Sequence, residues 1–215
     1  MTQAILFDFD GTLADTAPDL ALALNLLREE EGLEILEPAT VREVASMGAR
    51  GLLGAGFGIT PEDARFIELR DRFLDLYEAN LCVNTRLFPG VAELLDAIEQ
   101  RGMPWGIVTN KATRFTTPLV RALQLDARAA CVVCGDTTPK AKPAPDPLLH
   151  AARQIPVAPE ACLYVGDDER DVQASRAAGM RVIAAQYGYL SGGDPRRWNA
   201  DGIIQSPLEV LDHLG

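Results

Sequence analysis

The sequence predicts an α/β protein whose parallel sheet carries a helical insert after its first strand. Short apolar runs alternate with amphipathic stretches along most of the 215-residue chain, as in a parallel sheet that helices cover on both faces. One region, residues 16–87, breaks this alternation with helical patterns and no convincing strand. We therefore divide the chain into a core of residues 1–15 and 88–215 and a helical insert of residues 16–87.

The strands and helices of the core are predicted from its apolar patterns. The strands are Ile5–Phe9, Trp105–Thr109, Ala130–Cys134, Leu163–Val165 and Val182–Ala185, with a short last strand at Gly202–Ile204. The helices between them are Val91–Arg101, Phe115–Leu125, Pro147–Gln154 and Glu169–Ala178. The first helix places Val91, Leu94 and Ile98 on one face, and Gly179 ends the last.

The helices predicted in the insert are Pro18–Glu30, Val41–Met47 and Pro61–Tyr77. Thr16 and Thr60 stand where N-cap residues are favoured, and Pro18 suits the first turn of a helix. The stretch from Ser46 to Gly51 ends one helix of the insert and opens another.

Composition and charge exclude several classes of protein. With 47% hydrophobic residues, 14 Pro and 18 Gly, the chain reads as an ordinary globular protein. No apolar run approaches the roughly 20 residues that cross a bilayer, and the N-terminus lacks a signal-peptide pattern, so we expect a cytoplasmic protein without a membrane contact. The net charge of −11 makes nucleic acid a poor partner. Because this charge also repels anionic substrates, an anion site here needs local cations or a metal.

The cysteines and histidines form no convincing site of their own. Cys131 and Cys134 match C-x-x-C, but no second pair accompanies them and no helix begins after Cys131. We interpret both as small apolar residues of a buried strand. Nothing clusters near His150 or His213, which argues against a histidine-rich metal site or a Ser-His-Asp triad.

The residues suited to catalysis stand at the ends of predicted strands. The stretch "AILFDFDGTLADT" places Asp8 and Asp10 directly after a buried run, where like charges repel and burial is costly. The other sites are Thr109-Asn110-Lys111, Lys142-Pro143 and Gly166-Asp167-Asp168-Glu169-Arg170-Asp171. Because the carboxyl ends of parallel strands meet at one edge of the sheet, we expect all four sites to converge.

Paired acids at this edge suit a hard divalent cation. Mg²⁺ prefers oxygen ligands and often bridges carboxylates to phosphate. Asp8 and Asp167 are candidate ligands, with the backbone carbonyl of Asp10, and Lys142 adds a positive charge. The predicted hydrogen-bond donors to phosphoryl oxygens are Thr109 and Asn110. One carboxylate would attack phosphorus, and the other would protonate the leaving oxygen and then activate water.

In these motifs the sequence resembles the haloacid dehalogenase superfamily, in its phosphoglycolate phosphatase-like group. The matching stretches are "DFDGTLADT", "TNK", "KPAPDP" and "GDDERDVQASRAAGM", and the resemblance covers essentially the whole chain. It implies a Rossmann-like core, a helical cap formed by the insert, and an Mg²⁺-dependent phosphatase that acts on a small phosphorylated metabolite through a phospho-aspartyl intermediate.

The resemblance also implies a role for each matching residue. Asp8 is the nucleophile and Asp10 the acid/base. Phosphate binding falls to Thr109, Asn110 and Lys142, and metal binding to Asp8, Asp10 and Asp167. Asp171 is a further metal ligand or a residue that orients a metal-bound water. Many relatives carry Ser or Ala after the Gly-Asp pair, where this chain has Asp168, an extra acid beside the predicted metal.

The substrate is left open between two carboxylate-bearing phosphates. The stretches "SMGARGLL", "LFPGVAELL", "WGIVTNKATRF" and "YGYLSGGDPRRWNADGII" resemble the N-acetylmuramic acid 6-phosphate phosphatases of bacterial cell-wall recycling. That compound and phosphoglycolate both pair a phosphate with a carboxylate. In the cap, Gly48 permits a close approach of backbone to ligand, and Arg50 is the predicted partner of the carboxylate.

Other functions remain as alternatives. A dehalogenase needs no second acid in the first motif, and Asp10 is present. A phosphomutase would use the same residues, so only its products separate it from a phosphatase. A receiver-like signalling domain phosphorylated on Asp8 is disfavoured by the large insert, because receivers need open access to a partner. The oligomeric state is open between monomer and homodimer.

Overall fold

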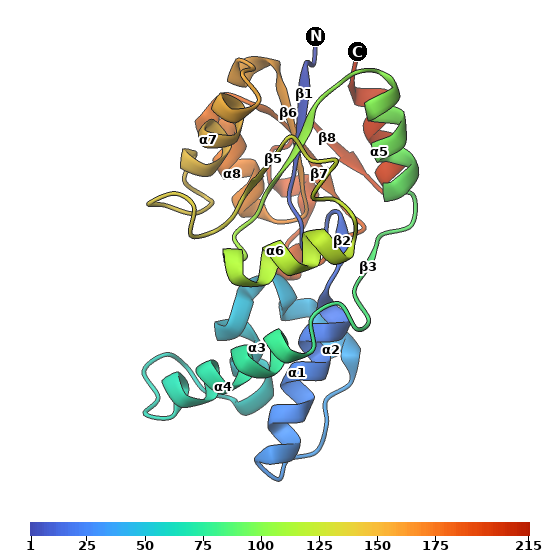
Figure 1. The fold of residues 1–215 in the computed structure, drawn as a ribbon. Coiled ribbons are helices and arrows are strands. Elements are labelled where there is room, and N and C mark those ends of the chain that lie inside the picture. Colours follow the sequence, from blue (N-terminus) through green and yellow to red (C-terminus); the bar gives the residue numbers. More distant parts are fainter.

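The computed structural model describes all 215 residues and contains a six-stranded sheet in the order β5-β4-β1-β6-β7-β8 (Figure 1). Its strands are β1 (Ala4–Phe7), β4 (Trp105–Val108), β5 (Cys131–Val133), β6 (Cys162–Gly166), β7 (Arg181–Ala185) and β8 (Gly202–Ile204). Every neighbouring pair is parallel, which confirms the predicted fold class. Later strands were added on both sides of β1, first β4 and β5 on one side and then β6, β7 and β8 on the other. Sheets of this kind bind ligands in the crevice at the carboxyl end of the strand where the order reverses, which here is β1.

Helices cover both faces of the sheet, as the continuous apolar run of β1 requires. Ile5 and Phe7 pack with α5 (Val91–Gln100), α6 (Thr113–Ala122) and a C-terminal 3₁₀ helix (Pro207–His213). Ala4 and Leu6, on the other face, pack with α7 (Asp146–Gln154) and α8 (Glu169–Ala178). None of the helices has the length and apolar character needed to cross a membrane.

The insert lies beyond the carboxyl ends of the strands (Figure 1). It contains α1 (Ala17–Glu30), α2 (Pro38–Val44), a 3₁₀ turn (Ala45–Met47), α3 (Gly48–Phe57) and α4 (Phe66–Ala79). The chain enters and leaves it through β2 (Ala14–Asp15) and β3 (Arg86–Leu87), which pair antiparallel. The sequence showed no strand here, because two-residue strands are too short for an alternating pattern.

The structure confirms one of the two N-cap positions expected in the insert and corrects the other. Thr16 is the N-cap residue of α1, although its side chain donates to Asp10 and makes no capping hydrogen bond. Thr60 caps nothing, because α4 begins only at Phe66, after Arg65. Residues 61–65, expected to be helical, form turns.

In the core, Cys131 and Cys134 are free and buried, as expected of small apolar residues.

Candidate active site

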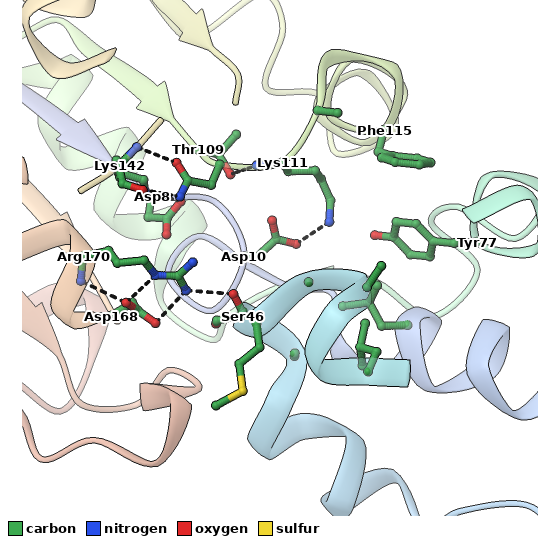
Figure 2. A pocket seen from close by; sticks show the side chains of 18 of the residues that line it. Asp8, Asp10, Ser46, Tyr77, Thr109, Lys111, Phe115, Lys142, Asp168 and Arg170 are labelled. Atoms are coloured by element: carbon green, nitrogen blue, oxygen red, sulfur yellow. Dashed lines mark hydrogen bonds and ion pairs between the residues drawn. The ribbon is translucent and has the colours of Figure 1, made fainter. Parts of the chain in front are cut away.

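The four sequence motifs meet at the carboxyl edge of the sheet, at the base of a cavity of about 300 Å³ (Figure 2). Asp8 follows β1, Thr109 follows β4 and Asp167 follows β6, because parallel strands end together. Lys142 reaches the same place from the loop between β5 and α7. The predicted convergence is therefore present in the fold.

Lys142 is a buried cation at the centre of this edge. Its side chain is 2% exposed, and Nζ lies 2.9 Å from Asp8 Oδ1 and 2.7 Å from Asp171 Oδ1. Nζ also lies 3.0 Å from the carbonyl of Val108 and 2.8 Å from the hydroxyl of Tyr164. Burial alone would lower the pKa of Lys142, but the charges of Asp171 and Asp8 raise it above its ordinary value. The side chain is thus a permanent positive charge.

Three carboxylates, those of Asp8, Asp167 and Asp171, bring oxygen atoms within 4.8 Å of one another. Asp167 is fully buried, and Thr12 Oγ1 donates to it over 3.0 Å and the backbone N–H of Tyr189 over 2.8 Å. Burial and the neighbouring acids raise the pKa of Asp167 well above its usual range, and burial raises that of Asp8 to about 7. When ionised, three acids outnumber the one lysine and attract a cation, and an all-oxygen donor set of this kind fits Mg²⁺.

The side chain of Asp10 stands apart from these three acids. Its Oδ1 lies 2.8 Å from Lys111 Nζ and also accepts from the hydroxyl of Thr16. The other carboxylate oxygen of Asp10, Oδ2, has no hydrogen-bond partner in the protein. This separation gives the two acids of the first motif different surroundings.

Thr109 and Asn110 contribute in different ways. The Thr109 oxygen accepts from the N–H of Lys111 over 3.1 Å, so its O–H proton is left to donate. The Asn110 amide is engaged with the backbone of Lys142, donating to its carbonyl and accepting from its N–H, both over 2.9 Å. Asn110 therefore fixes the loop that carries Lys142, and its backbone N–H remains available to a ligand.

Asp168 turns away from the three clustered carboxylates. Arg170 binds both of its oxygens over 2.8 Å, and the Ser191 hydroxyl donates to Oδ2 over 2.8 Å. Asp168 also forms a capping box with Asp171 at the start of α8. Although burial opposes its ionisation, the hydrogen bonds from Arg170 lower the pKa of Asp168 to about 2. The extra acid is thus the partner of an arginine.

The far wall of the cavity comes from the insert and α6, and it is largely apolar (Figure 2). Its main apolar residues are Leu20, Leu52, Phe73, Leu74, Tyr77 and Phe115. Gly48 lines the cavity as well, whereas Arg50 is exposed and lines a second hollow that shares Asp168 and Arg170 with it. The sequence predicted no role for three residues that line the cavity, Lys111, Tyr77 and Arg170. Lys111 and Arg170 stand within the quoted motifs, but Tyr77 has only the pattern of an apolar helix position.

Comparison with known proteins gives the family. The model of the haloacid dehalogenase-like hydrolases matches residues 5–185, and the chain belongs to this family. It is 41% identical over 213 residues to the N-acetylmuramic acid 6-phosphate phosphatase of Pseudomonas aeruginosa, covering 99% of this chain and 94% of that protein. It is 44% identical over 211 residues to the phosphoglycolate phosphatase of Xanthomonas campestris pv. campestris, covering 98% and 95%.

A solved structure agrees over the whole chain. That structure, of a predicted phosphoglycolate phosphatase from Haemophilus somnus 129pt, has a TM-score of 0.88 at 28% identity, covering 100% of this chain and 98% of its own. The resemblance and the enzyme class expected from the sequence, a phosphoric monoester hydrolase, are confirmed by these relatives.

Proposed function

We propose that the protein is an Mg²⁺-dependent phosphatase that hydrolyses a carboxylate-bearing phosphate monoester through a phospho-aspartyl intermediate on Asp8. The observation that carries this proposal is the cluster of Asp8, Asp167 and Asp171 around Lys142. Asp8, Asp167 and the backbone carbonyl of Asp10 would hold the metal, with Asp171 beside them. When bound, the metal would offset the charge of the acids and of the phosphate.

The hydrogen bonds support a different role for each acid of the first motif. Asp8 Oδ1 is held by Lys142 and by the N–H of Phe9 over 2.7 Å, which leaves Oδ2 free to attack phosphorus. The ester P–O bond breaks as the acyl phosphate forms, and protonated Asp10 gives its proton to the leaving oxygen. Asp10 then takes a proton from water as that water attacks phosphorus, which releases inorganic phosphate and restores Asp8.

Phosphate capture uses local cations and donors. Lys142 and the hydroxyl of Thr109 lie on the core side of the cavity, where they would stabilise charge on the phosphoryl oxygens. The backbone N–H of Asn110 completes this set.

Phosphoglycolate and N-acetylmuramic acid 6-phosphate are the two candidate substrates, and the lining of the cavity bears on the choice between them. Glycolate is a small polar leaving group that would leave most of an apolar wall unfilled. N-acetylmuramic acid is much larger and has apolar ring faces, so a cavity of about 300 Å³ with that wall favours its 6-phosphate. A cytoplasmic location stays a prediction, and so does the choice between monomer and homodimer.

Phosphate release from matched pairs of esters tests the activity and the substrate. Phosphoglycolate is paired with ethylene glycol monophosphate, and N-acetylmuramic acid 6-phosphate with N-acetylglucosamine 6-phosphate, which lacks the carboxylate. We expect the carboxylate-bearing member of one pair to have the higher kcat/KM. Release of inorganic phosphate, with no isomerised ester, separates a phosphatase from a phosphomutase. No steady turnover of any ester would leave the phospho-Asp signalling domain as the better description.

The nucleophile is tested by Asp8→Asn, because an amide does not attack phosphorus. This variant should fold and retain less than about a tenth of the wild-type kcat, since removing a nucleophile usually costs far more. Higher activity would contradict the covalent mechanism.

A further inference from the structure

Arg170 joins the core to the insert at the edge of the cavity (Figure 2). It lies in the first turn of α8, and its Nη2 donates to the backbone carbonyl of Ser46 over 2.7 Å. Ser46 belongs to the 3₁₀ turn between α2 and α3. Arg170 also lines both the catalytic cavity and the second hollow, so it stands where the two meet.

The guanidinium of Arg170 is held in one orientation. Nε and Nη2 bind the two oxygens of Asp168, each over 2.8 Å, and Ser191 fixes Asp168 from its other side. A fork–fork pair of this kind sets the plane of the guanidinium as well as its position. The extra acid after the Gly-Asp pair thus orients an arginine.

One nitrogen of this guanidinium, Nη1, makes no hydrogen bond within the protein. In Figure 2 it points away from Asp168, toward the side of the cavity that holds Asp8 and Asp10. The hydrogen bonds and charge of Asp168 raise the pKa of Arg170, and the charges of Asp171 and Asp8 add to this effect.

A second polar group without a partner lies at the same contact. Ser46 lines the catalytic cavity, and its hydroxyl is buried and has no hydrogen-bond partner. Buried hydroxyls without a partner are uncommon, because losing water without replacement costs free energy. An oriented guanidinium nitrogen and an unpaired hydroxyl thus belong to two residues that are in contact where the cavity passes from core to insert.

We propose that Nη1 of Arg170 and the hydroxyl of Ser46 bind the carboxylate of the leaving group. This assignment rests on the proposed function. A carboxylate accepts from a guanidinium and from a hydroxyl, so it would satisfy both groups at once. It gives to Arg170 the role that the sequence suggested for Arg50, which is exposed and lines only the second hollow.

The test compares each carboxylate-bearing ester with its carboxylate-free partner. Arg170→Met keeps the apolar stem and removes every donor. The ratio of kcat/KM between the better carboxylate-bearing ester and its partner should fall about 10- to 150-fold, the range for a hydrogen bond to a charged group. Arg121→Met removes a surface arginine that is 75% exposed, and it should leave the ratio unchanged.

Ser46→Ala keeps the test open if Arg170→Met does not fold. It removes the hydroxyl but retains the backbone carbonyl that Arg170 binds, and it should lower the same ratio about 10-fold. Circular dichroism establishes that each variant is folded.

Three results would overturn the assignment. Equal losses on both members of a pair would mean that Arg170 only holds the insert against the core. An unchanged ratio in both Arg170→Met and Ser46→Ala would mean that neither group contacts the carboxylate. A loss of the ratio in Arg50→Ala alone would return the role to Arg50. Failure of wild-type protein to release phosphate from any ester would instead overturn the proposed function.

Discussion

At the scale of single residues, the carboxylates of Asp167 and Asp171 fit only because the residues packed against them are glycines. A Cβ on Gly11 would lie 2.0 Å from Asp167 Oδ2, and one on Gly188 would lie 2.3 Å from Asp167 Cβ. A Cβ on Gly166 would lie 2.3 Å from Asp171 Oδ2. Gly11 also has a φ of +81°, which side-chain-bearing residues rarely adopt. Glycines therefore shape the proposed metal site although they bind nothing.

Replacing Gly11 with alanine should weaken the metal site. The new Cβ would displace the carboxylate of Asp167, so the Mg²⁺ concentration for half-maximal activity should rise at least about 10-fold, as for residues that orient metal ligands. The matched control is Gly102→Ala. Gly102 has a φ of +67°, but a Cβ added there would meet nothing within 4 Å, so that variant carries backbone strain alone. Equal Mg²⁺ requirements in the two variants would contradict this account.

The sequence predicted the acids of the site but not what holds them. Asp8, Asp10 and Asp167 stand out because acids directly after apolar runs are costly. Gly188 and the N–H of Tyr189 lie about twenty positions beyond Asp167 and reach it only because β6 and β7 pair in parallel. The sequence also could not predict the partner of Asp168, because an acid at the start of a helix can bind either a metal or an arginine.

At the scale of elements, the two crossings into the insert are tied to each other and to the core. Buried Asp19, in the first turn of α1, accepts from the N–H groups of Asn84 and Thr85 over 2.7 and 3.0 Å and from the Thr85 hydroxyl over 2.7 Å. The Tyr189 hydroxyl, from the core, accepts from the N–H of Thr16 over 2.7 Å. These bonds fix where α1 starts and where the chain returns to β3.

Asp19→Ala should therefore destabilise the protein by about 2–4 kcal/mol, because it leaves two backbone N–H groups and a hydroxyl unpaired in a buried place. Urea unfolding followed by circular dichroism measures the loss. Asp75→Ala removes an exposed acid of α4 and should change the free energy of unfolding by less than about 0.5 kcal/mol. A similar small effect at Asp19 would show that these hydrogen bonds do not secure the insert.

The elements of the core were predictable because each has a pattern long enough to read. The strand Gly202–Ile204 and the helix Glu169–Ala178 have the predicted bounds, and the other core elements differ by a few residues at their ends. The insert was less predictable. Pro61 and its preceding threonine imitate a helix start, yet α4 begins five residues later. The β2–β3 pair depends on contacts between segments some seventy residues apart, which no local pattern records.

At the scale of the whole molecule, the charge distribution opposes the ligand except at the cavity. The net charge of −11 repels a phosphate ester at a distance. The cations Lys142, Lys111 and Arg170 all line the catalytic cavity, so capture depends on groups that act over a few ångströms. Buried acids are also concentrated at the carboxyl edge of the sheet. The stability of the fold therefore depends on the protons or cations that neutralise these acids.

In a chelator, the protein should lose stability as the pH rises from about 4 to about 7. Burial raises the pKa of Asp8 to about 7, against the opposing charge of Lys142, whereas an aspartate in the unfolded chain titrates near 3.9. Between these values the folded protein binds more protons at Asp8 than the unfolded chain, so this contribution to the free energy of unfolding falls with rising pH. Asp167, whose pKa burial also raises, acts in the same direction.

Magnesium should reverse this loss, because a cation among the carboxylates favours their charged forms and binds the folded state alone. Unfolding in urea at pH 5 and pH 7, in EDTA or in Mg²⁺, measures both effects, and Asp8→Asn should show a smaller pH dependence in EDTA. The same pH dependence in wild type and Asp8→Asn would show that Asp8 does not cause the loss of stability.

Activity should vanish in EDTA and return with Mg²⁺ but not with Ca²⁺, whose longer bonds and additional ligands would misplace the attacking carboxylate. Full activity in EDTA would show that these acids do not form a metal site.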